Sequence, residues 1–216
     1  MVAKARIGVL ALQGDFAEHI EMLENLSAKA VKVKKHSDLN KLDGLIIPGG
    51  ESTAIKKLID RYDFENIIKE KVRDGMSLWG TCAGLICIAN KLTEDDPKPM
   101  KLIDAEVSRN WFGRQIDSFE TNLKFKGIRG DIKAVFIRAP IVNKVSSNVE
   151  VLSTLDEETI VAIKQDKILG TSFHPEISGS TKVHEYFINL SKTWFNIFLN
   201  ILSFFGINLT LRQYER

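Results

Sequence analysis

The sequence predicts an α/β fold of three layers, with a mostly parallel sheet and an antiparallel hairpin segment. Three observations lead to this prediction. Up to about residue 90, continuous apolar runs typical of strands covered on both faces alternate with amphipathic helical stretches. This alternation of strand and helix favours right-handed crossovers and parallel pairing. Later in the chain, short strand-like runs divided by turn residues indicate antiparallel pairing.

Size, composition and charge limit what this chain can be. Its 216 residues suffice for one α/β domain with a full core and are few for two. The net charge is +2 and the lysines are scattered along the chain. The sequence therefore predicts no basic surface that would bind nucleic acid or an anionic membrane. We therefore expect no nucleic-acid partner.

The two cysteines, Cys82 and Cys87, do not form the pattern of a disulfide framework. Neither has a second Cys or a His at zinc-ligand spacing. No signal-peptide pattern follows Met1. We therefore expect a reduced, cytoplasmic protein that needs neither a metal nor a cofactor.

The elements of the parallel sheet come first along the chain. Apolar runs predict strands at 7–12, 31–33, 42–47 and 76–79, and helical periodicity predicts helices that begin near Phe16, Ser52, Phe64 and Leu85. Asp15 stands immediately before the first of these helices, so its carboxylate is expected to cap that helix.

The antiparallel segment follows a polar, proline-broken loop at 94–99. Strand-like runs are predicted at 103–107, 121–125, 134–137, 149–155, 159–164 and 168–173. The last run stops at His174 and Pro175. An amphipathic helix is expected to begin near Ser180.

The final stretch differs from the rest. No charged residue lies between Lys192 and Arg212, and aromatic and aliphatic residues crowd together there. The length approaches a membrane span of ~20 residues, but several asparagines make it a poor one. A helix packed on this domain or a partner, a segment that is disordered or associates, and membrane contact all remain open, the last being least favoured. We place the folded domain at residues 1–192 and treat 193–216 as an apolar tail.

The centre of the chain carries the pattern Gly80-Thr-Cys82-Ala-Gly84 between a predicted strand and a predicted helix. This is the cysteine form of a nucleophile elbow, in which glycines on both sides of the nucleophile let the backbone reverse tightly. A cysteine at a helix N-terminus is also biased toward the thiolate. A buried cysteine in a glycine-rich turn would show the same five residues, so the motif alone leaves both interpretations open.

A nucleophilic cysteine needs a base and a group that orients the base. His174 ends a predicted buried strand at Pro175, and Glu176 is close enough in sequence to hold its ring by a hydrogen bond. A helix-start turn with a partly buried histidine is the alternative. His19 and His36 are most simply surface or structural residues, and His184 lies within the C-terminal helix.

The developing oxyanion needs hydrogen-bond donors. Gly49 and Gly50 follow the third predicted strand, whose end shares an edge of the sheet with the elbow. The N–H groups of Gly50 and Ala83 are therefore a candidate oxyanion hole. A tight strand-to-helix loop would use the same residues.

Three motifs in this order and spacing resemble those of class I glutamine amidotransferases, which have a flavodoxin-like fold. They are Pro48–Thr53, Trp79–Gly84 and Phe173–Glu176. Three more segments narrow the resemblance to the glutaminase subunits of pyridoxal 5′-phosphate synthase, the PdxT family. They are Leu10–Asp15, Arg109–Phe119 and Phe136–Pro140.

The resemblance implies a role for each matching residue. Cys82 would be the nucleophile that attacks the carboxamide of L-glutamine, His174 the base and then the acid, and Glu176 its orienting partner. The positions that match substrate contacts are Gly50, Glu51, Ser52, Arg109, Ile137 and Arg138. An arginine suits the α-carboxylate because its planar fork binds two oxygens. Residues 1–192 would then be a glutaminase domain.

The resemblance also implies a partner. Ammonia would pass to a (β/α)8 synthase subunit that makes pyridoxal 5′-phosphate from ribose 5-phosphate and glyceraldehyde 3-phosphate, within a large hetero-oligomer. Two alternatives are an amidotransferase subunit of another pathway, such as imidazole glycerol phosphate synthesis, and a non-catalytic binding or stress-response module. Two features depart from the family pattern: Cys87 at an apolar helix position and the tail after Lys192.

Overall fold

The structure, a computed structural model, describes residues 4–109 and 118–192 and is built on a mixed sheet of ten strands within those residues. One half of the sheet is parallel, with β2, β1, β3, β4 and β12 side by side in that order. These strands are β1 (Arg6–Leu10), β2 (Lys29–Val33), β3 (Gly44–Ile47), β4 (Ser77–Thr81) and β12 (Ile168–Thr171). Four residues of β3 and all five of β4 are buried, as the continuous apolar runs predict.

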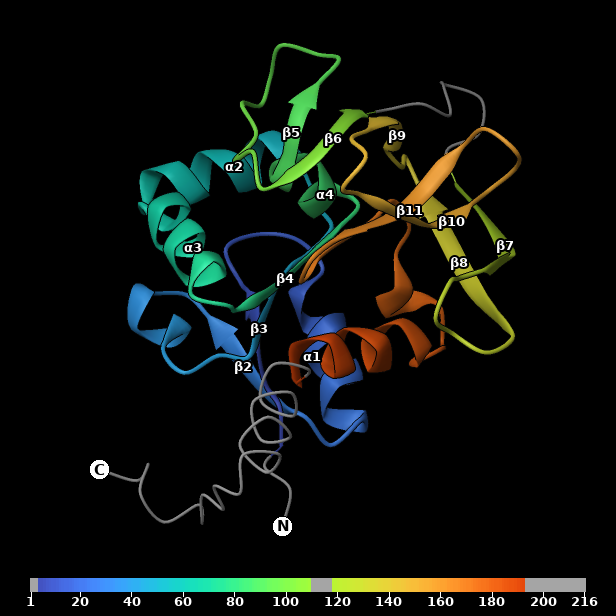
Figure 1. The fold of residues 1–216 in the computed structure, drawn as a ribbon. Coiled ribbons are helices and arrows are strands. Elements are labelled where there is room, and N and C mark those ends of the chain that lie inside the picture. The colour runs from blue at the N-terminus through green and yellow to red at the C-terminus, as the bar shows by residue number, and fades with distance from the viewer. Residues whose placement is uncertain (1–3, 110–117, 193–216) are drawn as a thin grey trace, which may run out of the picture.

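The other half of the sheet is mostly antiparallel and continues from β12 through β11, β9, β6 and β5. Its strands are β5 (Ala89–Leu92), β6 (Ile103–Ser108), β9 (Ile141–Val145), β10 (Glu150–Thr154), which pairs with β11, and β11 (Ile160–Gln165). A separate hairpin joins β7 (Ser118–Lys124) to β8 (Asp131–Ile137). The hairpin stands next to β10 and β11 (Figure 1).

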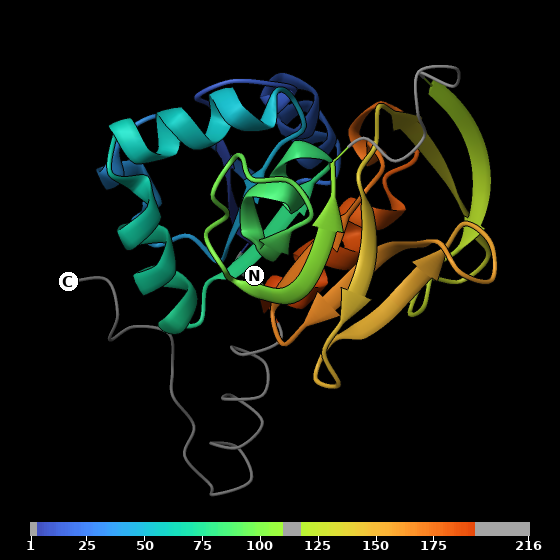
Figure 2. The same ribbon diagram turned by 90° about the horizontal axis from the view of Figure 1, so that it is seen from above.

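Helices cover both faces of the sheet, which gives the three layers (Figures 1 and 2). One apolar core lies between the sheet and α2, α3 and α4, and the second lies between the sheet and α1, the C-terminal helix and the hairpin. The helices are α1 (Phe16–Asn25), α2 (Ser52–Arg61), α3 (Phe64–Arg73), α4 (Ala83–Ile88) and the C-terminal helix at 182–192. Two short 3-10 turns, η1 (His36–Leu39) and η2 (Pro175–Ile177), complete the set.

The predicted fold class is confirmed, and four details differ from the sequence prediction. Two strands, β5 and β9, were not predicted, and β12, which forms the predicted antiparallel hairpin with β11, also pairs in parallel with β4. The predicted strand at 76–79 runs on through Thr81, so Cys82 follows the strand directly. Asp15 stands at the N-cap position of α1, but its side chain makes no capping hydrogen bond there, so that prediction was wrong.

None of the helices among residues 4–109 and 118–192 is long and apolar enough to span a bilayer. The apolar tail at 193–216 lies outside the described residues, as does most of the Arg109–Phe119 segment. The domain boundary at 192 therefore stays a prediction.

Gly84→Ala is expected to destabilise the fold by about 3 kcal/mol. A Cβ atom at this position would lie 2.0 Å from the backbone oxygen of Ile47, so β3 and α4 would have to separate. Urea unfolding at pH 7 measures the loss. Gly179→Ala is the control, because its methyl group would lie in open space. Only the positive φ of 73° at this position opposes a side chain, so the free energy of unfolding should fall by about 1 kcal/mol. Equal losses in the two variants would contradict the steric argument.

Candidate active site

The elbow at Cys82 is a tight reversal between β4 and α4. Cys82 has φ 47° and ψ −105°, a conformation that L-residues rarely adopt and that is typical of strained functional turns. A Cβ atom on Gly80 would lie 2.5 Å from the carbonyl group of Gly84, and one on Gly84 would meet Ile47. The close approach of three backbone segments therefore requires both glycines, for the reason that the sequence pattern suggests.

His174 reaches the elbow because β12 lies parallel to β4, with Thr171 opposite Thr81. Three residues beyond the end of β12, the backbone N–H of His174 donates to the carbonyl oxygen of Val135 in β8, 2.8 Å away. Pro175 then begins the η2 turn, which brings Glu176 back beside the ring. Nδ1 of His174 lies 2.6 Å from Oε1 of Glu176, and both side chains are almost fully buried.

The imidazole of His174 interacts with the thiol of Cys82 as well as with Glu176. Burial disfavours its charge, but side-chain hydrogen bonds with Cys82 and Glu176 outweigh burial and raise the pKa of His174 to about 10. Burial raises the pKa of Glu176, and the interaction with His174 opposes that rise. Cys82 is 7% exposed, and its Sγ lies 4.0 Å from the carbonyl oxygen of Ile137. The arrangement can hold a proton on the imidazole beside the sulfur of Cys82.

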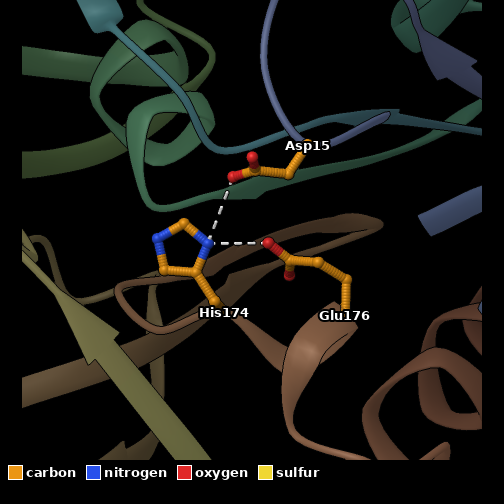
Figure 3. Close-up of side chains that lie close together, drawn as sticks. All are labelled: Asp15, His174 and Glu176. Atoms are coloured by element: carbon orange, nitrogen blue, oxygen red, sulfur yellow. Dashed lines mark hydrogen bonds and ion pairs between the residues drawn. The ribbon is translucent and has the colours of Figure 1, made fainter. Parts of the chain in front are cut away.

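A second carboxylate, that of Asp15, also faces the His174 ring. Its Oδ2 lies 3.5 Å from the same Nδ1, so two carboxylates approach one ring nitrogen (Figure 3). The backbone N–H of Asp15 donates to the carbonyl oxygen of Gly49, 3.1 Å away. Sequence reasoning placed this side chain on the helix end and missed its position at the site.

Asp15, His174 and Glu176 are also the one set among the described residues whose ligand atoms, all within 4.8 Å of one another, could hold a metal ion. At 2.6 Å, however, Nδ1 and Oε1 are at the distance of a charge-assisted hydrogen bond with a proton between them. A metal would have to displace that proton. The distance between His174 and Glu176 is therefore that of an imidazole oriented by a carboxylate.

The loop after β3 passes close to the first strand-to-helix loop. Gly50 has φ 145° and lies against Gln13 and Gly14, where a Cβ atom would clash. The backbone N–H of Glu51 donates to Oε1 of Gln13, 3.0 Å away. The carboxylate of Glu51 accepts the backbone N–H groups of Thr53 and Ala54 and thereby caps α2. Sequence reasoning missed this capping role.

The two predicted arginines occupy different settings. The guanidinium of Arg109 lies 3.5 Å from the carboxylate of Glu51 and donates to the backbone oxygen of Asp96 at 2.8 Å. Arg138 is exposed and has φ 45°, immediately after Ile137. Two groups of predicted residues are thus brought together: Cys82 with His174, Glu176 and Ile137, and Arg109 with Glu51.

Comparison with known proteins identifies the family of this chain. The family model described as the SNO glutamine amidotransferase family matches residues 9–192. The chain belongs to this family. A pyridoxal 5′-phosphate synthase subunit PdxT from Dehalococcoides mccartyi is 52% identical over 192 residues, which cover 88% of this chain and 98% of the relative. The subunit of the same name from Corynebacterium jeikeium is 47% identical, over 86% of this chain and 96% of the relative.

Solved structures agree with membership of the glutamine amidotransferase family. One described as a glutamine amidotransferase has 42% identity and a TM-score of 0.82, and the match covers 87% of this chain and 99% of that one. PurLQS from Thermotoga maritima, at 16% identity and a TM-score of 0.64 over 87% of this chain, shows only that the fold is shared.

This member of the amidotransferase family also buries two further histidines: His19, which sequence reasoning left as a surface or structural residue, and His184, which it placed within the C-terminal helix. His19 and His184 are both fully buried, with Nδ1 of His19 2.9 Å from Nε2 of His184. Burial lowers the pKa of His19 well below its usual value, and burial lowers that of His184 to about 3. A signal was present: His19 lies between Phe16, Ile20 and Leu23 on the apolar face of α1.

Replacing His184 with phenylalanine is expected to make the fold less sensitive to acid. The buried ring has a pKa of about 3, whereas its usual value is 6.5. Between those values only the unfolded chain binds the proton, so the free energy of unfolding falls as the pH is lowered. In the variant this slope should be smaller by about 1.4 kcal/mol per pH unit between about pH 6 and pH 4.

Urea unfolding at a series of pH values measures both slopes. A slope that is the same in His184→Phe as in the parent would show that His184 is not held neutral by the fold.

Proposed function

We propose that this chain is the glutaminase subunit of a pyridoxal 5′-phosphate synthase and that it hydrolyses L-glutamine to L-glutamate and ammonia. The observation that carries the proposal is the buried hydrogen bond between His174 and Glu176, with the His174 ring interacting with Cys82 at the strained elbow. Such a series of thiol, imidazole and carboxylate activates a nucleophile and supplies the acid that its leaving group needs. Membership of the SNO glutamine amidotransferase family supports glutamine as the substrate, and the PdxT relatives, similar over nearly their whole length, support the assignment to a pyridoxal 5′-phosphate synthase.

The proposed reaction uses the thiol of Cys82 and the imidazole of His174. His174 takes the proton of the Cys82 thiol, and the sulfur attacks the side-chain carboxamide carbon of glutamine to form a tetrahedral intermediate. The imidazolium gives its proton to the leaving nitrogen, the C–N bond breaks, and ammonia leaves a thioester on Cys82. His174, now neutral, takes a proton from water, whose oxygen attacks the thioester carbon. The C–S bond then breaks, which releases glutamate.

Glu176 acts through the ring of His174 and does not contact the reacting atoms. Its Oε1 fixes the ring by accepting from Nδ1, which leaves Nε2 for the sulfur and the substrate. Because Glu176 is nearly fully buried, its charge is screened little by water and stabilises the imidazolium strongly.

The oxyanion of the tetrahedral intermediate is assigned to two backbone donors, Ala83 N–H and Gly50 N–H. Ala83 is the first residue of α4, where the N–H groups lack helical partners. The carbonyl oxygen of Gly49 accepts from Asp15, so the planar trans peptide directs the N–H of Gly50 the opposite way.

The rest of the substrate is assigned to the loops around the elbow. We assign the α-carboxylate of glutamine to Arg109, whose guanidinium is held by Glu51 and Asp96. Gly50, Glu51 and Ser52 would contact the substrate from the β3 side. Ile137 and Arg138, at the end of β8, would contact it from the other side.

Ammonia would pass to a (β/α)8 synthase subunit that makes pyridoxal 5′-phosphate from ribose 5-phosphate and glyceraldehyde 3-phosphate. The pair would form a large hetero-oligomer in the cytoplasm. The names of the relatives support this pathway over imidazole glycerol phosphate synthesis. The retained Cys82, His174 and Glu176 count against a non-catalytic module.

Cys82→Ala is expected to lower glutamate release at least about 10³-fold, because no other group supplies the nucleophile. The assay couples glutamate release to a dehydrogenase. Glutamine is the substrate, and the (β/α)8 synthase subunit is present as the partner. Cys87→Ala is the matched control. Burial raises the pKa of Cys87 to about 12, so it stays a thiol, and its loss should leave the rate within about threefold. A Cys82→Ala enzyme with the parent rate would refute the proposal.

Arg109→Met is expected to raise the KM for glutamine by about 10- to 100-fold, because a charge-assisted bond to the α-carboxylate is lost. The same assay, run over a range of glutamine concentrations, measures this. Arg61→Met removes an exposed arginine from the end of α2 and should leave KM as it is. The assignment fails if KM in Arg109→Met equals that of the control.

A further inference from the structure

The second oxygen of Glu176 is not accounted for by the proposed catalytic series. Oε1 faces His174, whereas Oε2 is buried and has no hydrogen-bond partner within the part of the chain that the structure describes. Oε2 lies 3.4 Å from Nε2 of His19. A buried carboxylate oxygen without a donor is costly, so the group that faces it bears on how this carboxylate is held.

His19 comes from α1 and lies beneath the elbow. Its Nε2 lies 3.2 Å from Oγ1 of Thr81, the residue immediately before Cys82, as well as beside Glu176. Its Nδ1 lies 2.9 Å from Nε2 of His184, and its ring packs edge-on against Trp79 with centroids 5.6 Å apart. One ring therefore contacts the end of β4, the η2 turn and the C-terminal helix.

The tautomer of His19 decides what it offers to Glu176. If Nε2 carries the proton, it can donate toward Oε2, and Nδ1 accepts from Nε2–H of His184. If Nδ1 carries the proton, a lone pair faces the carboxylate oxygen, and Nδ1 of His184 becomes a buried N–H without a partner among the described residues. Orphaned N–H groups are rarer in folded proteins than unfilled acceptors. The Nε2–H form satisfies more of the cluster.

His19 offers this donor without a charge. Burial, followed by the neighbouring His184 and His174, lowers its pKa well below the usual value. The charged or titratable groups around the cluster are His184 from the C-terminal helix, His174 and Glu176 from the segment after β12, and Asp15 from the loop before α1. A neutral donor can support Glu176 without repelling the imidazolium of His174.

We propose that His19 is a positioning residue whose Nε2–H donates toward Oε2 of Glu176, with His184 fixing the tautomer. This inference rests on the proposed function, because it gives Glu176 the orienting role. In this arrangement the two neutral imidazoles of His19 and His184 lie behind the carboxylate of Glu176, on the side of Oε2, whereas His174 faces Oε1. Loss of the donor would leave a buried carboxylate oxygen unsupported, so Glu176 would favour its protonated form and His174 would hold its proton less firmly.

The first test needs no variant and no activity. In the full chain labelled with ¹⁵N-histidine, long-range ¹H–¹⁵N spectra distinguish the two neutral tautomers of each ring. The expected result is Nε2–H for His19 and for His184. An Nδ1–H tautomer at His19 would overturn the proposal.

The second test compares His19→Leu, which removes the donor, with His19→Gln, whose side-chain NH2 can take the place of Nε2–H. In the ¹⁵N titration, His19→Leu should lower the pKa of His174 by about one unit or more, and His19→Gln should keep it within about half a unit of the parent. An unchanged His174 titration in a folded His19→Leu chain would overturn the proposal.

The third measurement is glutamate release with the synthase subunit present, as a function of pH. His19→Leu should lower kcat at least about tenfold and move the alkaline limb of the profile to lower pH, with KM within about twofold. His19→Gln should restore most of kcat. A defect shared equally by the Leu and Gln variants, with the parent pH profile, would indicate a merely structural role and overturn the proposal.

These readouts separate the two proposals. If the parent chain released no glutamate, the proposed function would fail, while the tautomer and the His174 titration would still report on His19. If the parent is active and the titrations do not respond to His19→Leu, only the positioning role fails.

Discussion

The close approach of three backbone segments at the elbow is the constraint on which the rest of the site depends. The end of β4, the start of α4 and the carbonyl oxygen of Ile47 in β3 meet where Gly80 and Gly84 have no side chains. That contact forces Cys82 into a strained conformation directly after the strand. The strain is maintained because β4 and β3 are buried central strands, whose pairing holds both ends of the turn in place.

The second element of the site follows from the register of the sheet. β12 pairs in parallel with β4, so the chain leaves the sheet at the same edge from both strands. His174 is then fixed by its own backbone hydrogen bond to Val135. At this position the two hydrogen bonds to the ring outweigh the burial that would otherwise drive off its proton. A buried site makes each of these bonds stronger and makes each missing one more costly.

Local patterns in the sequence predicted the elbow, the first four strands of the parallel half of the sheet and the pairing of His174 with Glu176, because each is encoded in a few adjacent residues. Features set by distant contacts were not predictable in this way. The sequence predicts that Asp15 caps a helix, yet its carboxylate faces the ring of His174, which follows the last strand of the domain. β5 was missed because Ala89 follows α4 without a turn residue, and β9 because nothing local marks its partner strands. His19 stood on an apolar helix face, where periodicity shows burial but not the group that it meets.

The choice of a neutral ring beneath Glu176 has a physical rationale. A lysine or arginine at the position of His19 would also satisfy Oε2, but its charge would compete with the imidazolium for the same carboxylate and repel it across a poorly screened interior. A hydrophobic residue would leave the oxygen without a donor. A histidine that burial keeps neutral, and that His184 holds in one tautomer, meets both requirements at once. On this argument, the imidazole pair leaves the negative charge of Glu176 available to His174 alone.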